Sequence, residues 1–197
     1  MQPPDLIAGR FRLETRVGAG AMGVVYRARD EADGGTVAVK TLRSADEGPS
    51  ARFLREAAAL AGLEHPVIIR HVAHGLHEGT EPYLALEWID GSTLATRVRT
   101  AGLTPLEAIV LALRLVDGLC ALHAQGIVHR DLKPGNLMLP GDDVSQVRIL
   151  DLGIARFADA STELTVAGSQ LGTPRYMAPE QVSGGQVDHR VDLYAFG

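Results

Sequence analysis

The apolar residues of this chain change their spacing from the alternation of β-strands to the period of helices, and this change restricts the fold most. Alternation over 11–17, 23–29 and 36–42 predicts three strands, because successive side chains of a strand point to opposite faces. A Gly-Gly pair at 34–35 predicts a tight turn between the last two. From Ser50 to Leu63 the apolar spacing becomes helical. The first part of the chain is therefore predicted to form a β-hairpin, a third strand and one helix.

Two further strands are predicted at 66–75 and 82–89, and they complete a small antiparallel sheet that carries the helix. After Gly91 the pattern is mostly helical. A longer helix is predicted to run to about His123, and its start is marked by an N-cap, a first-turn proline and a capping-box glutamate at Thr104, Pro105 and Glu107. The stripe predicted to be buried on this helix comprises Ile109, Val110, Leu113, Val116 and Cys120.

The composition excludes several classes of protein. Hydrophobic residues make up 46% and charged residues 22% of the 197 residues, as in globular and not in disordered chains. A net charge of −5 gives no reason to expect nucleic acid as a partner. No long apolar run or signal-peptide core is present, so no membrane segment is predicted in this chain and the expected location is cytoplasmic, or the cytoplasmic side of an anchored protein. The single cysteine, Cys120, excludes an internal disulfide and fits a reducing compartment.

A short polar run, VHRDLKPGNLML at 128–139, concentrates ionisable side chains between apolar residues. Taken alone, a solvated turn without activity is an alternative interpretation. The apolar residues on both sides predict short strands, however, so a rigid scaffold is expected to hold the loop in place. Functional sites are commonly built on such loops.

The glycine-rich segment between the first two predicted strands has the spacing GxGxxGxV, with glycines at Gly18, Gly20 and Gly23. A dinucleotide-binding fingerprint requires a helix after the glycines, whereas glycines in a hairpin suit a flap that closes over phosphates. An ordinary tight turn remains the alternative for this motif on its own.

Two charged residues are placed where they could meet in a cleft. In VAVK, Lys40 shares a strand face with Ala38, opposite the two valines, so it is predicted to reach under the glycine flap. An exposed strand lysine is the alternative for this motif alone. Glu56 lies at the edge of the apolar face of the first helix and is expected to need a cationic partner.

Taken together, these motifs resemble the protein kinase family, and in particular its bacterial Ser/Thr members. They follow the family's order along essentially the whole chain: GAGAMGVV, VAVK, a helix glutamate, HRDLKPGN, DLG and GTPRYMAPE. The resemblance implies an α+β, two-lobed protein-kinase-like fold. Its small antiparallel β-sheet lobe with one helix, together with the hinge, would occupy 1–89, and a larger, mainly helical but incomplete lobe would occupy 90–197.

The resemblance further implies that ATP and Mg²⁺ bind in the cleft between the lobes. Asp131 would accept or orient the proton of the attacking hydroxyl, and Lys133 would lie near the transferring phosphoryl group. Lys40 would bridge the phosphates and Glu56. The implied ligands of the metal are Asn136 and Asp151. The implied nucleotide-contacting residues are Gly18, Ala19, Gly20, Gly23, Val25, Ala38, Lys40, Leu86, Glu87, Ile89 and Leu139.

The implied substrates are proteins that present Ser or Thr hydroxyls. Lys133 and Thr173 occupy positions that are typical of Ser/Thr kinases and not of tyrosine kinases. Thr173 and Pro174 would contribute to the groove for the substrate. Autophosphorylation is also implied, and it would bring two copies of the chain together as a dimer.

Control by phosphorylation is expected in the polar segment from Asp159 to Ser169, which has few apolar anchors. Thr165 is the first candidate, followed by Thr162 and Ser169. The added charge would order the segment by pairing with Arg130.

One leucine and three histidines lie outside the family motifs or depart from them. Leu152 replaces the phenylalanine that usually follows the metal-binding aspartate in the family, which affects only the fine packing of active and inactive states. His71 stands where leucine is common and is predicted to be a satisfied core histidine, with a pH switch as the alternative. His74 and His77 are predicted to be solvated, and the sequence spacing predicts no zinc site.

The chain ends early in a helix whose Asp192 is predicted to brace the polar loop. Glu180 is then expected to lack the arginine with which it pairs in the family, and breaking a buried pair costs about 3–5 kcal/mol. We therefore expect this chain alone to be marginally stable. Two functions follow from the sequence: an active Ser/Thr kinase, or a catalytically weak module that binds a nucleotide or a partner. A small-molecule phosphotransferase is disfavoured by GTPRYMAPE, which in the family shapes a groove for a peptide.

Overall fold

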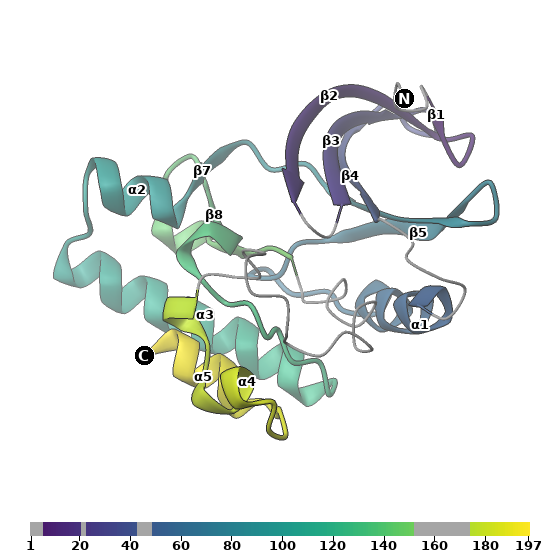
Figure 1. Ribbon diagram of the computed structural model, residues 1–197. Coiled ribbons are helices and arrows are strands. Elements are labelled where there is room, and N and C mark those ends of the chain that lie inside the picture. The colour runs from purple at the N-terminus through teal and green to yellow at the C-terminus, as the bar shows by residue number, and fades with distance from the viewer. Residues whose placement is uncertain (1–5, 21–22, 43–48, 152–173) are drawn as a thin grey trace. The chain divides into compact units, whose positions relative to one another are not determined.

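The computed structural model describes residues 6–20, 23–42, 49–151 and 174–197, and the side chains of 49–52, 56 and 174 lie outside the description. Two compact units divide these residues (Figure 1). The first lies within Met1–Leu63 and Arg70–Trp88, and the second within Glu64–Ile69, Ile89–Gly153 and Glu163–Gly197.

The first unit contains an antiparallel sheet and one helix, α1 (Pro49–Ala61). The order of the strands in the sheet is β1-β2-β3-β4-β6-β5. Their bounds are β1 (Leu6–Ile7), β2 (Phe11–Gly20), β3 (Gly23–Asp30), β4 (Thr36–Leu42), β5 (His71–His77) and β6 (Glu81–Glu87). The predicted hairpin, the third strand and the helix are therefore confirmed.

Alternation along the strands separates the two faces of this sheet. Val37 and Val39 of β4 are buried in one core cluster with Phe11, Tyr83 and Ala85, which come from other strands. Ala38 and Lys40, between and after the valines, belong to the opposite face, as the sequence predicts. On α1, the side chains of Phe53, Ala57 and Leu60 are buried.

The strand predicted at 66–75 begins only at His71, and residues 66–69 belong to the second unit. There, Ile149 donates its backbone N–H to the carbonyl of Val67 at 2.7 Å, and Ile69 donates to the carbonyl of Ile149 at 3.1 Å. The expectation that His77 is solvated is wrong. Its ring is buried, and Nδ1 accepts a hydrogen bond from the backbone N–H of Ala8 at 3.1 Å.

The buried carboxylate of Asp30, at the end of β3, is bonded to Arg10 near the start of the first unit. The guanidinium of Arg10 donates to both oxygens of Asp30, at 2.8 and 2.7 Å, and the backbone N–H of Ala32 donates to Oδ1 at 3.0 Å. The hydrogen bonds from Arg10 hold the pKa of Asp30 below its ordinary value of 3.8, against the opposing effect of burial.

We expect Asp30→Asn to lower the free energy of unfolding by about 1.5–3 kcal/mol at pH 7, because hydrogen bonds to a charged group are lost. A carboxyl group with a lowered pKa in the folded state stabilises the protein above its unfolded pKa and loses this effect as the pH falls through the folded pKa. The difference between variant and parent should therefore shrink below about pH 4 and vanish at lower pH. Urea denaturation across pH 2–7 measures it. Asp33→Asn, an exposed change in the same turn, should show no comparable trend.

The second unit is mainly helical and carries a small sheet of strand order β7-β8-β9. Its helices are α2 (Leu94–Thr100), α3 (Pro105–Ala124), α4 (Pro179–Ser183) and α5 (Arg190–Phe196). Its strands are β7 (Gly91–Thr93), β8 (Leu137–Pro140) and β9 (Arg148–Ile149), and short 3₁₀ turns are η1 (Pro134–Asn136), η2 (Val144–Gln146) and η4 (Pro174–Tyr176).

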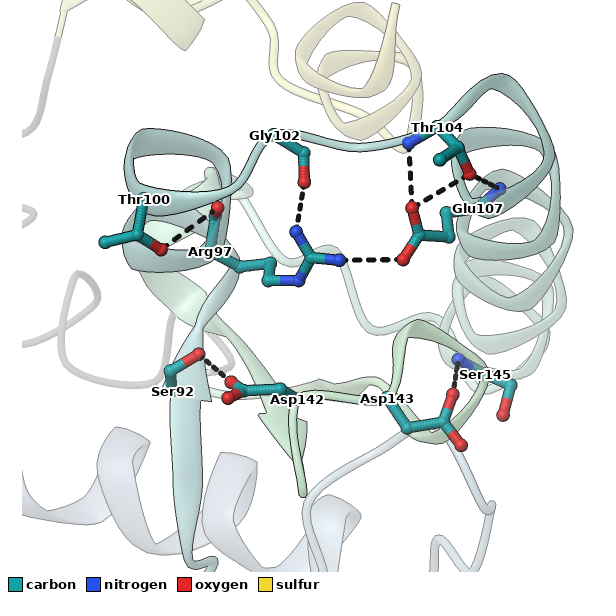
Figure 2. A network of polar contacts seen from close by, with 9 residues as sticks. All are labelled: Ser92, Arg97, Thr100, Gly102, Thr104, Glu107, Asp142, Asp143 and Ser145. Atoms are coloured by element: carbon teal, nitrogen blue, oxygen red, sulfur yellow. Dashed lines mark hydrogen bonds and ion pairs between the residues drawn. The ribbon is translucent and has the colours of Figure 1, made fainter.

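The predicted capping box starts α3 as expected. The backbone N–H of Glu107 donates to Oγ1 of Thr104 at 3.2 Å, and the N–H of Thr104 donates to Glu107 Oε2 at 2.7 Å. Arg97 of α2 extends this network, donating to Glu107 Oε1 at 2.8 Å and to the carbonyl of Gly102 (Figure 2). The hydrogen bonds that the backbone and the hydroxyl of Thr104 donate to the Glu107 carboxylate, together with Arg97, hold the pKa of Glu107 below its ordinary value. The corner between α2 and α3 is therefore fixed by one arginine and one capping glutamate.

The buried stripe predicted on α3 is wrong. Ile109 and Leu113 remain 58% and 66% exposed, Val116 and Cys120 are exposed too, and Val110 is half-buried. The buried residues of the helix are instead Leu111, Leu115, Gly118, Leu119 and Leu122. Apolar residues follow both faces of α3, so periodicity could not choose between them. Within the described ranges, no helix has the length and apolar character needed to cross a bilayer.

Candidate active site

A buried carboxylate of α5 holds the polar loop that the sequence singles out. Asp192 has no exposed surface, and its Oδ2 accepts the backbone N–H of His129 at 2.8 Å while Oδ1 accepts that of Arg130 at 2.7 Å. Nε2 of His123, at the end of α3, lies 2.8 Å from Asp192 Oδ2. Asp192 therefore braces the loop, as predicted from the sequence.

His129 forms the floor of this loop. The ring is fully buried, Nδ1 accepts the backbone N–H of Asp131 at 3.2 Å, and Nε2 lies 2.8 Å from the carbonyl oxygen of Leu150. Burial lowers the pKa of His129, against the opposing effects of the Leu150 carbonyl and of nearby carboxylates. A neutral ring with its proton on Nε2 satisfies both contacts. The histidine thus fixes the backbone of Asp131 without carrying charge.

Asp131, Lys133 and Asn136 converge on a single carboxylate oxygen. Lys133 Nζ lies 2.7 Å from Asp131 Oδ2, and Nδ2 of Asn136 donates to the same oxygen at 3.0 Å and to the Asp131 carbonyl at 2.8 Å. The side chains of Asp131 and Lys133 are 21% and 25% exposed, so solvent or a ligand can reach the pair. Both bonds of the Asn136 amide are made by its nitrogen, and its oxygen Oδ1 takes part in neither.

Asp151 lies next to this group because of a backbone contact. The N–H of Leu150 donates to the carbonyl of Asn136 at 2.8 Å, which places the following residue beside η1. Asp151 is exposed and has a φ of 49°, and Arg130 has a φ of 63°. Left-handed backbone at residues other than glycine is uncommon and gathers at functional sites.

The predicted glycine flap is the hairpin of β2 and β3 in the first unit. Gly20 pairs with Gly23 and Gly18 with Val25, while the two residues at the tip lie outside the description. Gly23 has a φ of 147°, and a Cβ there would overlap the backbone carbonyl of Thr41. At Gly18 and Gly20, a Cβ would meet no described atom within 4 Å. Packing within the protein therefore explains Gly23 and leaves open space at the other two.

Lys40 follows this hairpin in the sheet, paired with Val25 of β3 on one side and Leu84 of β6 on the other. Ala38 pairs with Leu86 on the same face. Next to Leu86, Glu87 is fixed by its backbone N–H, which donates to the carbonyl of Arg70 at 3.0 Å. Lys40 and Ala38 of β4 are thus held next to Leu84 and Leu86 of β6 by regular strand pairing.

The other predicted residues fall in different parts of the chain. Ile89 and Leu139 belong to the second unit, where Leu139 is fully buried. Ala19 lies in the hairpin opposite Val24. Several predicted residues lie outside the described residues or have side chains that do: Glu56, Thr162, Thr165, Ser169, Thr173 and Pro174, together with Leu152.

Comparison with known proteins now decides the family. The model of the protein kinase domain matches residues 11–197. The chain belongs to the protein kinase domain family. The predicted family and its fold class are thereby confirmed.

Bacterial Ser/Thr kinases are among the relatives of this kinase domain. It is 40% identical over 205 residues to serine/threonine-protein kinase pkn2 of Myxococcus xanthus, covering 100% of this chain and 25% of that protein. It is 38% identical over 205 residues to PknB of Mycobacterium tuberculosis, covering 100% of this chain and 32% of that protein. The chain thus spans about a quarter to a third of the length of these relatives.

Two solved kinase structures are similar in fold. The kinase domain of Mycobacterium tuberculosis PknI superposes with a TM-score of 0.75 at 28% identity, covering 100% of this chain and 74% of that one. Rad53 1–466 in complex with AMP-PNP superposes with a TM-score of 0.77 at 28% identity, covering 95% of this chain and 46% of that one.

Two residues that help to hold the polar loop at 128–139 were not identified from the sequence. One is His123, which gives no signal beyond its place in the last turn of α3. The other is Gln181 of α4, whose Nε2 donates to the carbonyl of Arg130 at 2.9 Å while its Oε1 accepts the N–H of Ala178 at 3.0 Å. Gln181 lies three residues after Ala178, the N-cap of α4, and a Glu or Gln at this position is a capping signal that could have identified it.

Proposed function

We propose that this kinase domain transfers the γ-phosphoryl group of ATP to Ser and Thr hydroxyls of proteins, including its own, with Mg²⁺ as cofactor. The observation that carries this proposal is the shared oxygen of Asp131, which holds both Lys133 and Asn136. The proposed lobes are 1–89 and 90–197. The Ser/Thr kinases among the relatives support the substrate class.

Asp131 is the proposed acceptor of the proton from the substrate hydroxyl. Its backbone is fixed by neutral His129, and its carboxylate is partly exposed, so a hydroxyl can approach it. General-base assistance of this kind contributes about 10²–10⁴-fold to a rate.

Lys133 is the proposed electrostatic partner of the transferring group. Phosphoryl transfer spreads negative charge over the equatorial oxygens, so catalysis consists mainly of positioning and charge neutralisation. The 2.7 Å contact with Asp131 fixes the ammonium group beside the proposed base. The one lysine thereby orients Asp131 and offers positive charge where the phosphoryl group would pass.

The donor set of the second unit fits Mg²⁺. Asn136 Oδ1 and the Asp151 carboxylate are hard oxygen donors on adjacent pieces of backbone. Bound Mg²⁺ would neutralise the charge of the phosphate oxygens. In the described part of the chain, no three His, Cys, Asp or Glu side chains gather as a metal cluster, and this agrees with an ion held by one or two protein ligands and by phosphates.

Most of the proposed contacts for the nucleotide lie in the first unit, and two of them, Ile89 and Leu139, belong to the second. The open space above Gly18 and Gly20 leaves room for phosphates beside the β2–β3 hairpin. Lys40 would bind these phosphates and pair with Glu56. The proposed contacts of the rest of the nucleotide are Ala19, Gly23, Val25, Ala38, Leu86, Glu87, Ile89 and Leu139.

Regulation by phosphorylation is part of the proposal. Arg130 would bind phosphate added at Thr165, or at Thr162 or Ser169. Thr173 and Pro174 would contact the protein substrate. Phosphopeptide mapping of active protein that finds no modification between Asp159 and Thr173 would contradict this regulation without affecting the proposed catalytic residues.

Intact-mass spectrometry after incubation with ATP and Mg²⁺ tests the proposed function. We expect mass increments of phosphate in this sample and none in a sample with excess chelator. A parallel thermal-shift measurement separates catalysis from binding, because a ligand that binds only the folded state raises its stability without turnover. A stabilised chain that gains no phosphate, and phosphorylates no added protein, would favour the nucleotide-binding module instead.

A further inference from the structure

An irregularity in β5 brings two histidines of this strand together. His71 pairs with Leu86 and Ala73 pairs with Ala85, so two residues along β5 correspond to one residue along β6. Val72 is therefore an additional residue in β5. In a regular strand, residues three apart point to opposite faces. The additional residue reverses this relation, and His71 and His74 emerge on the same face.

The two rings meet through ring nitrogens. Nε2 of His71 lies 2.8 Å from Nδ1 of His74, and the ring centroids are 5.0 Å apart at an interplanar angle of 62°. His74 pairs with Leu84 as His71 pairs with Leu86, and directly opposed residues share a face. The pair therefore lies on the face opposite the core cluster that contains Tyr83.

Both rings are in the uncharged state that metal binding requires. Burial lowers the pKa of His71 and of His74, and the neighbouring ring lowers that of His71 further. At neutral pH both imidazoles are thus uncharged, and a single proton occupies the space between the two facing nitrogens. Neutral imidazole is the form that coordinates transition metals.

We propose that His71 and His74 form a binding site for a divalent transition-metal ion, represented by Zn²⁺, with Nε2 of His71 and Nδ1 of His74 as the protein ligands. When the ion binds, the shared proton moves to the other nitrogen of the ring that carries it, so that both facing nitrogens offer a lone pair and both ligands stay neutral imidazoles. Zn–N bonds of about 2.0–2.1 Å in a tetrahedral site set the nitrogens about 3.3 Å apart, so the pair opens by only about half an ångström.

The remaining positions on the ion belong to water. Among the residues that the structure describes, no third His, Cys, Asp or Glu side chain joins the pair. Both histidines are half-buried, which leaves solvent access to one side. The site is therefore of the open kind, in contrast to closed structural zinc sites with four protein ligands. Its imidazole ligands select Zn²⁺ and similar ions over Mg²⁺, which prefers oxygen.

Titration of the chain with Zn²⁺ against a chromophoric chelator tests this site. We expect that His71→Gln and His74→Gln each weaken Zn²⁺ binding at least tenfold. The matched control is His189→Gln, which removes an exposed imidazole from the second unit and should leave this binding unchanged.

A second measurement needs no variant. In ¹H–¹⁵N spectra of the histidine rings of the unmodified chain, Zn²⁺ should shift Nε2 of His71 and Nδ1 of His74 and leave the other rings unchanged. This readout remains decisive if a variant fails to fold. Absence of Zn²⁺ binding, or shifts confined to other histidines, would overturn the proposal and leave the pair as a structural hydrogen bond.

Discussion

Asp131→Asn is expected to lower the rate of phosphate incorporation by about 10²–10⁴-fold, the range that a positioned general base contributes. The asparagine amide retains the shape of the side chain and cannot accept the substrate proton. It also removes the negative charge that holds Lys133 Nζ at 2.7 Å. Intact-mass spectrometry over time, with ATP and Mg²⁺ present, measures the rate.

The control for this prediction is Asp117→Asn, which removes an exposed carboxylate of α3 whose nearest ion pair is His65 at 3.4 Å. It should incorporate phosphate at the parent rate. An Asp131→Asn chain that keeps more than a tenth of that rate, while folded by thermal melting, would remove Asp131 from the role of base.

Local signals in the sequence predicted the β2–β3 hairpin, β4 and the start of α3 well. The glycine hairpin, the alternation of Val37 and Val39, and the capping box at Thr104 are decided by residues close together in the chain. The loop that contains Asp131 was found in the same way, since its polar residues are consecutive. Its support by Asp192 was also anticipated, through the family resemblance.

Choices that depend on distant parts of the chain were not predictable. The two apolar faces of α3 are equivalent in periodicity, and only packing shows that Leu115 is buried while Leu113 is exposed. His77 is adjacent to a turn, yet it accepts a bond from Ala8, 69 residues earlier in the chain.

The same limit applies to the histidine pair. The spacing of His71 and His74 in the sequence places them on opposite faces of a regular strand, and this gave no reason to expect a metal site. The additional residue in β5 is visible only in the pairing with β6. Irregular pairing can therefore create a site that sequence spacing alone excludes.

Asp192→Asn is expected to lower the free energy of unfolding by about 3–5 kcal/mol, as is usual when one partner is removed from a buried polar network. One carboxylate oxygen becomes an amide nitrogen that donates, and it then faces the backbone N–H of His129 or Arg130, which also donates. A buried donor without an acceptor costs about 1–3 kcal/mol. Urea denaturation measures the change, which is large against a typical stability of about 5–15 kcal/mol.

The matched control is Asp188→Asn, an exposed change just before the same helix, which keeps an oxygen for the N–H of Arg190. It should change stability by less than about 1 kcal/mol. Native-state hydrogen exchange gives a readout specific to the loop: at least one of the N–H groups of His129 and Arg130 should lose protection in Asp192→Asn, and both should keep it in the control. Unchanged protection at both groups would contradict the bracing role of Asp192, because in the structure it is the carboxylate that accepts both of them.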